Sequence, residues 1–246
     1  MTRRTFRTRD DVTLAGRRWL AEHEPRASVV LVHGFTASAD HRDVVAVAET
    51  LHTTGLDVVS YDARGHGRSE SHSTLGDLER HDVAAAVAVA RERSDRVVLV
   101  GASMGAIAVV RYAVEDPDLA GVVSVSCPAR WRLPRSPLGV LSAGMTRTGL
   151  GRALAARHLN VRIAPRWTNP TPPVDLVDRI RVPLALVHGT RDRFISPADA
   201  RELHAKSGAP TRLIEVTGMG HAFAPESFAV ISDAVDWALS VTTTPA

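Results

Sequence analysis

The sequence has very little cysteine and lysine. Cys127 and Lys206 are the only representatives of their types among 246 residues. One cysteine cannot close a disulfide within the chain, which excludes the disulfide-stapled folds of small secreted domains. No uninterrupted apolar run approaches the roughly 18 residues that a membrane-spanning helix needs. The N-terminal segment MTRRTFRTRDD is also not followed by the apolar stretch of a secretory signal. These absences together predict a cytoplasmic protein.

Acidic residues are missing from one long stretch of the chain. Residues 119–174 carry eight arginines and no Asp or Glu. Such a basic segment has two explanations, which are a composition bias towards arginine and an anionic partner. No nucleic-acid-binding motif accompanies the arginines, so a nucleic acid is not expected as the partner. Peripheral contact with an anionic membrane or with an acidic carrier protein stays open.

The length and composition suit one globular α/β domain, with 44% hydrophobic and 23% charged residues. A hairpin is expected over residues 5–22. Six short runs rich in β-branched residues predict buried strands at 28–34, 57–62, 96–103, 121–127, 182–189 and 211–218. Helical patterns lie between them, with apolar faces formed by Val44, Val47, Ala48 and Leu51; by Val83, Ala86, Val87 and Ala90; by Ile107, Val110 and Val114; and by Phe228, Ile231, Val235 and Leu239. This alternation predicts a mostly parallel central sheet flanked by helices on both faces.

One connection is much longer than the others. The alternation breaks off after Cys127 and resumes only with the strand at 182–189, and the segment between them contains seven prolines. Ordinary crossovers are far shorter. We interpret residues 128–173 as a cap inserted after the sixth strand, and residues 1–127 and 174–246 as the core of the same domain.

Polar residues stand directly after the expected strands, where a parallel sheet binds its ligands. The segment GASMG (residues 101–105) follows one strand and precedes a helical pattern. A serine on such a sharp turn sits in strained geometry, and glycines two residues before and after it avoid clashes with neighbouring backbone. The turn raises the hydroxyl of Ser103 above the sheet and leaves the N–H of Met104 free to bind an oxyanion. This context predicts a nucleophile, and a structural glycine-rich turn is the alternative.

A serine nucleophile needs a base, and the base needs an acid to orient it. His221 is the candidate base among eleven histidines, because it follows the last strand in a glycine-flanked turn. Asp192 is the candidate acid, because it lies just beyond the strand at 182–189. An exposed loop carboxylate is the alternative for Asp192. Asp199 is interpreted as an acid in the first turn of a helix.

Taken together, these motifs resemble those of the α/β-hydrolase family over nearly the whole chain. The turn around Ser103, the Asp192 loop and the His221 turn match the family's catalytic serine, acid and histidine. Within the family, the similarity is to carboxylesterases and to serine hydrolases like monoacylglycerol lipase. The resemblance implies an α/β-hydrolase fold with a short cap.

Two further loops carry the resemblance. His33-Gly34-Phe35 is similar to the family's oxyanion loop, in which the residue after His-Gly, here Phe35, supplies a second N–H beside that of Met104. The segment DARGHGRS (residues 62–69) is similar to a family loop that shapes the floor of the site.

The resemblance implies a carboxylic ester hydrolase that works through an acyl-enzyme. No cofactor is expected, and the histidines and acids lack the spacing of a metal site. The substrate is expected to be an acyl ester, and an anionic, lipid-like ester would suit the basic cap. A thioesterase or an acyltransferase would use the same residues. A hydrolase-fold receptor without catalysis and cofactor-free oxidation chemistry are the other classes that stay open.

Apolar side chains of the cap are the candidates for contact with the acyl group. They are Trp131, Leu138, Leu141, Met145 and Trp167. Leu138, Leu141 and Met145 would share one side of a helix, although glycines in this segment weaken it. Packing of the cap against itself is the alternative role for these residues.

Overall fold

An eight-stranded sheet runs through the centre of the protein, in the order β1-β2-β4-β3-β5-β6-β7-β8. The computed structural model describes residues 1–131 and 143–241. The strands are β1 Thr2–Arg7, β2 Thr13–Trp19, β3 Ser28–Val32, β4 Asp57–Tyr61, β5 Val97–Ala102, β6 Gly121–Val125, β7 Leu184–Gly189 and β8 Thr211–Val216. β2 pairs antiparallel with β1 and β4, and every other neighbouring pair is parallel. The expected hairpin and six parallel strands are therefore confirmed.

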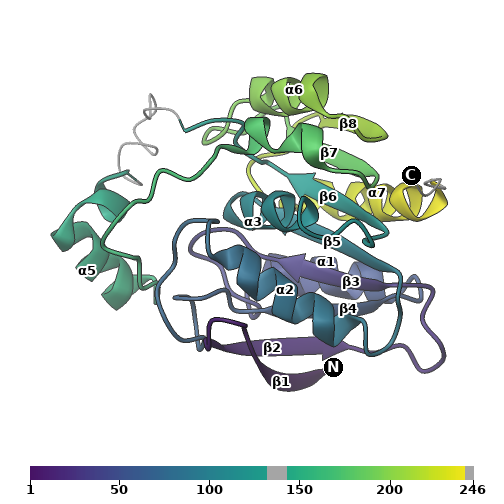
Figure 1. Ribbon diagram of the computed structural model, residues 1–246, viewed down its shortest axis with the longest axis horizontal. Coiled ribbons are helices and arrows are strands. Elements are labelled where there is room, and N and C mark those ends of the chain that lie inside the picture. The colour runs from purple at the N-terminus through teal and green to yellow at the C-terminus, as the bar shows by residue number, and fades with distance from the viewer. Residues whose placement is uncertain (132–142, 242–246) are drawn as a thin grey trace.

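Helices cover both faces of the sheet (Figure 1). One face carries α2 Glu79–Ala90, α3 Met104–Ala113 and α6 Pro197–Lys206, and the other carries α1 Arg42–His52 and α7 Phe228–Ser240. Short 3-10 turns are η1 Pro173–Asp175, η2 Val177–Arg179 and η3 Pro225–Ser227. The predicted inner faces are buried in α1, with Val44, Val47, Ala48 and Leu51, while Val114, Phe228 and Leu239 of the other predicted faces are only partly buried. Among the described residues, no helix is both long and apolar enough to cross a bilayer.

The central strands are buried on both faces, as their continuous apolar runs predict. Every residue of β3, β4 and β6 is buried. Two apolar layers result, one on each side of the sheet. Because β3, β5, β6, β7 and β8 are parallel, the loops that follow them meet at one edge of the sheet.

The segment after β6 leaves the sheet. Its best-defined helix is α5 Gly149–His158, which stands away from the sheet in Figure 1. One glycine of this segment is required by close packing, since a Cβ atom at Gly151 would lie 2.2 Å from the carbonyl oxygen of Gly144. Residues 143–147 are also helical. Leu138 and Leu141 lie outside the described residues.

The single cysteine lies at the end of β6. The side chain of Cys127 is only 2% exposed. Burial raises the pKa of its thiol to about 12, because the thiolate would lose its hydration. This thiol is therefore almost entirely protonated at neutral pH.

Candidate active site

Ser103 occupies a strained turn between β5 and α3. Its φ of 54° and ψ of −112° lie outside the regions that residues other than glycine ordinarily adopt. A Cβ atom at Gly101 would lie 2.4 Å from the carbonyl oxygen of Gly105, and one at Gly105 would lie 2.4 Å from that of Val32. The two glycines are therefore required for the close approach of three backbone segments. This is the steric reason for the G-x-S-x-G spacing.

Three side chains from distant parts of the chain meet at this turn. The Nε2 atom of His221 lies 2.9 Å from the Oγ atom of Ser103. The Nδ1 atom of the same ring lies 2.7 Å from the Oδ2 atom of Asp192. An ionised Asp192 can only accept, so Nδ1–H donates to it and Nε2 accepts the serine proton. The imidazole thus has the tautomer of a base towards Ser103.

The carboxylate of Asp192 is held by its own loop. Its Oδ1 atom accepts from the N–H groups of Phe194, at 2.8 Å, and Ile195, at 2.9 Å. Burial acts to raise the pKa of this carboxyl, but hydrogen bonds from His188 and His221 outweigh it and hold the pKa below its ordinary value. Asp192 is therefore ionised at neutral pH, with one oxygen directed at the loop and the other at the imidazole.

His188 is a second histidine beside the acid. Its Nε2 atom lies 3.1 Å from the carbonyl oxygen of Ile195 and 3.4 Å from Oδ2 of Asp192. Both neighbours are acceptors, so Nε2 carries the proton. Its bond to Ile195 holds the loop that carries Asp192.

Phe194 and Ser126 contact the His221 turn, and the sequence analysis missed both. The ring of Phe194 lies 5.0 Å from the imidazole, tilted by 41°. The hydroxyl of Ser126 accepts from the N–H of Ala222 at 3.2 Å. An aromatic residue inside the polar loop RDRF (residues 191–194) was the available signal for Phe194. Ser126 lies at the end of a buried strand and offered no such signal.

Two backbone N–H groups flank Ser103 without acceptors. In the described part of the chain, neither Phe35 N–H nor Met104 N–H donates to a protein group. Met104 begins α3, where the first N–H groups of a helix point outwards. The loop with Phe35 packs directly on the serine, since a Cβ atom at Gly34 would lie 3.4 Å from Cβ of Ser103. Both groups are thus available to an oxygen atom bound at this turn.

Among the predicted substrate contacts, the two tryptophans meet each other within the cap. Their ring centroids are 5.3 Å apart in an edge-to-face arrangement. The Nε1–H of Trp131 donates to the carbonyl oxygen of Pro170 at 2.6 Å, while Trp167 is partly exposed. Met145 is half-buried and lies beside Gly151 of α5. Their contact with a substrate stays a prediction.

Comparison with known proteins assigns the family. A family model described as serine aminopeptidase, S33 matches residues 23–171. The chain belongs to this family. A relative, the monoacylglycerol lipase of Mycolicibacterium smegmatis, is 27% identical over 90% of this chain and 91% of that protein. An uncharacterized protein of Bacillus subtilis is 24% identical over 82% of this chain and 67% of its own length.

A solved structure of an esterase shares the fold. The esterase Pf2001 of Pyrococcus furiosus superimposes with a TM-score of 0.73, at 25% identity, over 96% of this chain and 91% of that one. The α/β-hydrolase fold predicted from the sequence is therefore confirmed. This S33 family member is an esterase- or lipase-like α/β hydrolase.

Proposed function

We propose that this protein is a serine hydrolase that cleaves a carboxylic ester through a covalent acyl-enzyme. Ser103 is the nucleophile, His221 is the general base and Asp192 orients the base. The observation that carries the proposal is the continuous chain of two hydrogen bonds, of 2.9 Å and 2.7 Å, that joins these residues. The esterase and lipase among the similar proteins support an ester as the bond that is cleaved.

In the acylation step, the Oγ atom of Ser103 attacks the acyl carbonyl carbon while Nε2 of His221 takes the hydroxyl proton. The carbonyl oxygen becomes an oxyanion, which the N–H groups of Phe35 and Met104 stabilise. Each donor of this kind typically contributes about 3 to 4 kcal/mol to the transition state. The imidazolium then protonates the alkoxide, so the alcohol leaves and the acyl group stays on Ser103.

In the deacylation step, the same imidazole removes a proton from water, and the resulting hydroxide attacks the acyl-enzyme. Ser103 recovers its proton from the imidazolium as the carboxylic acid leaves. Asp192 stays ionised throughout and stabilises the imidazolium in both steps. The side chain of His221 is 21% exposed, which leaves room for water to reach it.

The cap favours an acyl substrate with a negative charge. Helix α5 exposes Leu150 by 74% and Leu154 by 46%, and Arg147 and Arg157 are exposed close by in the sequence. No acidic residue occurs between 119 and 174 to neutralise these arginines. We propose that this surface attracts an anionic, lipid-like ester, or the anionic membrane or acidic carrier that presents it.

A fluorophosphonate probe tests the proposal directly. Ser103 Oγ should displace fluoride from phosphorus in the wild type, whereas Ser103→Ala should not be labelled and should lose hydrolysis of nitrophenyl esters. A panel of nitrophenyl esters of rising chain length then reports the acyl preference. Parallel assays with an acyl thioester, and with an added alcohol as acceptor, separate ester hydrolysis from thioesterase and acyltransferase activity. An active, labelled Ser103→Ala variant would contradict the proposal.

A further inference from the structure

The loop after β4 holds a segment of the cap. Arg162 N–H donates to the carbonyl oxygen of Gly65, and Ser73 N–H donates to that of Arg162, both at 2.7 Å. Ala164 N–H donates to the carbonyl oxygen of Ser73 at 2.8 Å. Residues 160–164, here called the cap tether, therefore run between the two halves of the loop like an added strand. Residues 62–69 of this loop are the segment similar to the family loop that shapes the floor of the site.

The fit between the cap tether and the loop is close. A Cβ atom at Gly65, where φ is 75°, would lie 2.4 Å from the carbonyl oxygen of Arg162 and 2.3 Å from the nitrogen of Ser73. The guanidinium of Arg162 also donates to the carbonyl oxygens of Ser71, at 3.2 Å, and Ser69. Main-chain and side-chain bonds thus fix the tether to the core.

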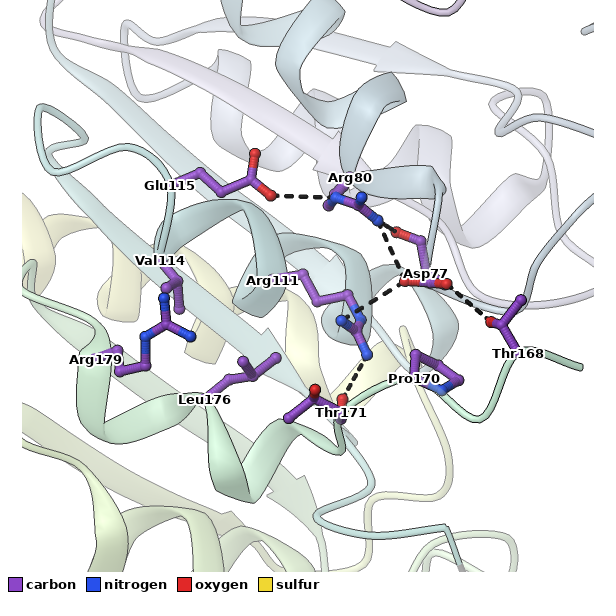
Figure 2. A pocket seen from close by; sticks show the side chains of 10 residues that line it. All are labelled: Asp77, Arg80, Arg111, Val114, Glu115, Thr168, Pro170, Thr171, Leu176 and Arg179. Atoms are coloured by element: carbon purple, nitrogen blue, oxygen red, sulfur yellow. Dashed lines mark hydrogen bonds and ion pairs between the residues drawn. The ribbon is translucent and has the colours of Figure 1, made fainter.

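A second attachment holds the end of the cap (Figure 2). Asp77 accepts from the hydroxyl of Thr168 at 3.0 Å, and it pairs with Arg80 at 3.2 Å and Arg111 at 3.6 Å. Arg111 also donates to the carbonyl oxygen of Thr171. These residues line a cavity of about 360 Å³ that contains none of the three residues joined at Ser103. Two charged residues of the cavity, Asp77 and Arg111, therefore attach the cap to the core.

The tether presses an apolar cluster onto the oxyanion loop. Ala155 of α5 together with Val161 and Ile163 of the tether forms a buried group, and the ring of Phe35 packs against it. Val161 is only 1% exposed. On another side, the Phe35 ring meets the edge of the His66 ring, at 5.9 Å and 87°. The partly buried ring of Phe35 thus lies between the cap and the core.

The position of this ring matters because the same residue carries an oxyanion donor in the proposed mechanism. The loop has little regular structure of its own, and the next residue, Thr36, has a φ of 70°. A donor N–H must lie within about 2.7 to 3.1 Å of the oxyanion, and displacement weakens it steeply. Contacts of the Phe35 ring can therefore determine how well the Phe35 N–H is placed to donate to the oxyanion.

We propose that Val161 and Ile163 are positioning residues for catalysis, which act through the Phe35 ring to hold the Phe35 N–H at the oxyanion. The inference rests on the proposed function, because it assigns a role to a donor of that mechanism. The oxyanion exists in the transition state and not in the bound ester, so loosening the donor lowers kcat with little change in KM.

The test compares Val161→Ala with Val235→Ala. Val235 is also fully buried but lies on α7, in the apolar layer on the α1 and α7 side of the sheet, which Phe35 does not contact. With nitrophenyl acetate, whose acyl group is too short to need the cap, Val161→Ala should lower kcat about ten-fold and keep KM within two-fold. Val235→Ala should keep both constants within two-fold. The rate of fluorophosphonate labelling should fall in parallel with kcat, because the phosphoryl oxygen occupies the same donors.

A double-mutant cycle distinguishes positioning from general loosening. Phe35→Ala keeps the N–H and removes the ring, so adding Val161→Ala to it should change kcat less than two-fold. An unchanged kcat in Val161→Ala, or the full ten-fold loss in the Phe35→Ala background, would overturn the inference. Should Val161→Ala not fold, Ile163→Val against Ile231→Val repeats the comparison with the loss of one methyl group. A wild type that neither hydrolyses esters nor reacts with the probe would instead refute the proposed function.

Discussion

Replacing Asp192 by asparagine tests the orientation of the base, and the structure fixes how the new amide would sit. The Oδ1 position accepts two backbone N–H groups, so the asparagine oxygen must occupy it. The NH₂ group then takes the place of Oδ2, 2.7 Å from Nδ1 of His221. It donates to Nδ1 and moves the ring proton to Nε2. The imidazole then presents a donor to Ser103 and no longer a base.

With this tautomer, the variant should lose most of its kcat but little of its thermal stability. A loss of about 10³ to 10⁴ in kcat is typical of the change, which corresponds to about 4 to 5 kcal/mol of transition-state stabilisation. The melting temperature should fall modestly, because the amide oxygen keeps both loop hydrogen bonds while the NH₂ group loses the interaction of Oδ2 with His188. Steady-state hydrolysis of a nitrophenyl ester and thermal unfolding measure the two effects.

Asp116→Asn provides a matched control. Asp116 is also a buried carboxylate, but it pairs with Tyr112 at 2.7 Å and with Arg91 at 3.0 Å, at the far end of α3. Its asparagine variant should retain kcat within a few-fold. If Asp192→Asn also kept kcat within ten-fold of the wild type, Asp192 would not be the acid and the reasoning from the hydrogen-bond chain would be refuted.

Two further predictions concern salt and pH. For an ester that carries a negative charge, kcat/KM should fall several-fold as sodium chloride rises from about 0.05 to 0.5 M, because salt screens the basic cap. The kcat/KM for a neutral short ester should not change. Equal salt responses for the two esters would count against an anionic substrate. Burial lowers the pKa of His33 and His66 to about 4, from 6.5. The unfolded chain therefore binds these protons first, and the free energy of unfolding should decrease from about pH 6.5 to 4, by up to about 1.4 kcal/mol per pH unit for each ring. In urea unfolding at several pH values, the free energy of unfolding should change less with pH in His66→Gln than in the wild type. The control His204→Gln, at an exposed site, should behave as the wild type. An unchanged pH dependence in His66→Gln would contradict the role given to His66.

There is a physical reason why the sheet could be predicted from the sequence, and with it the place where Ser103, Asp192 and His221 meet. Short continuous apolar runs rich in β-branched residues are typical of central strands, and parallel strands bring the loops after them to one edge. Ser103, Asp192 and His221 each follow such a strand directly, so their meeting follows from topology. The glycine pattern around Ser103 added a local steric signal that does not depend on distant contacts.

The cap could not be predicted in the same way. Its main contacts are backbone hydrogen bonds, such as those between Arg162 and Gly65, and backbone pairing leaves no mark on residue type. The helix at Gly149–His158 also has two glycines in its first turn, which have poor helix propensity, and Gly151 permits its close approach to Gly144. The contact of the Phe194 ring with His221 could not be predicted either, because it arises only when two distant loops meet in the fold.

The burial of Cys127 gives the protein a practical property. Its protonated, enclosed sulfur should react very slowly with maleimides and iodoacetamides, which attack thiolates. A cysteine introduced at the exposed position of Leu150 would then be the sole readily alkylated site. Fluorescent or spin labels attached there would report the movement of α5, and Cys127 would not need to be replaced because it would stay unlabelled.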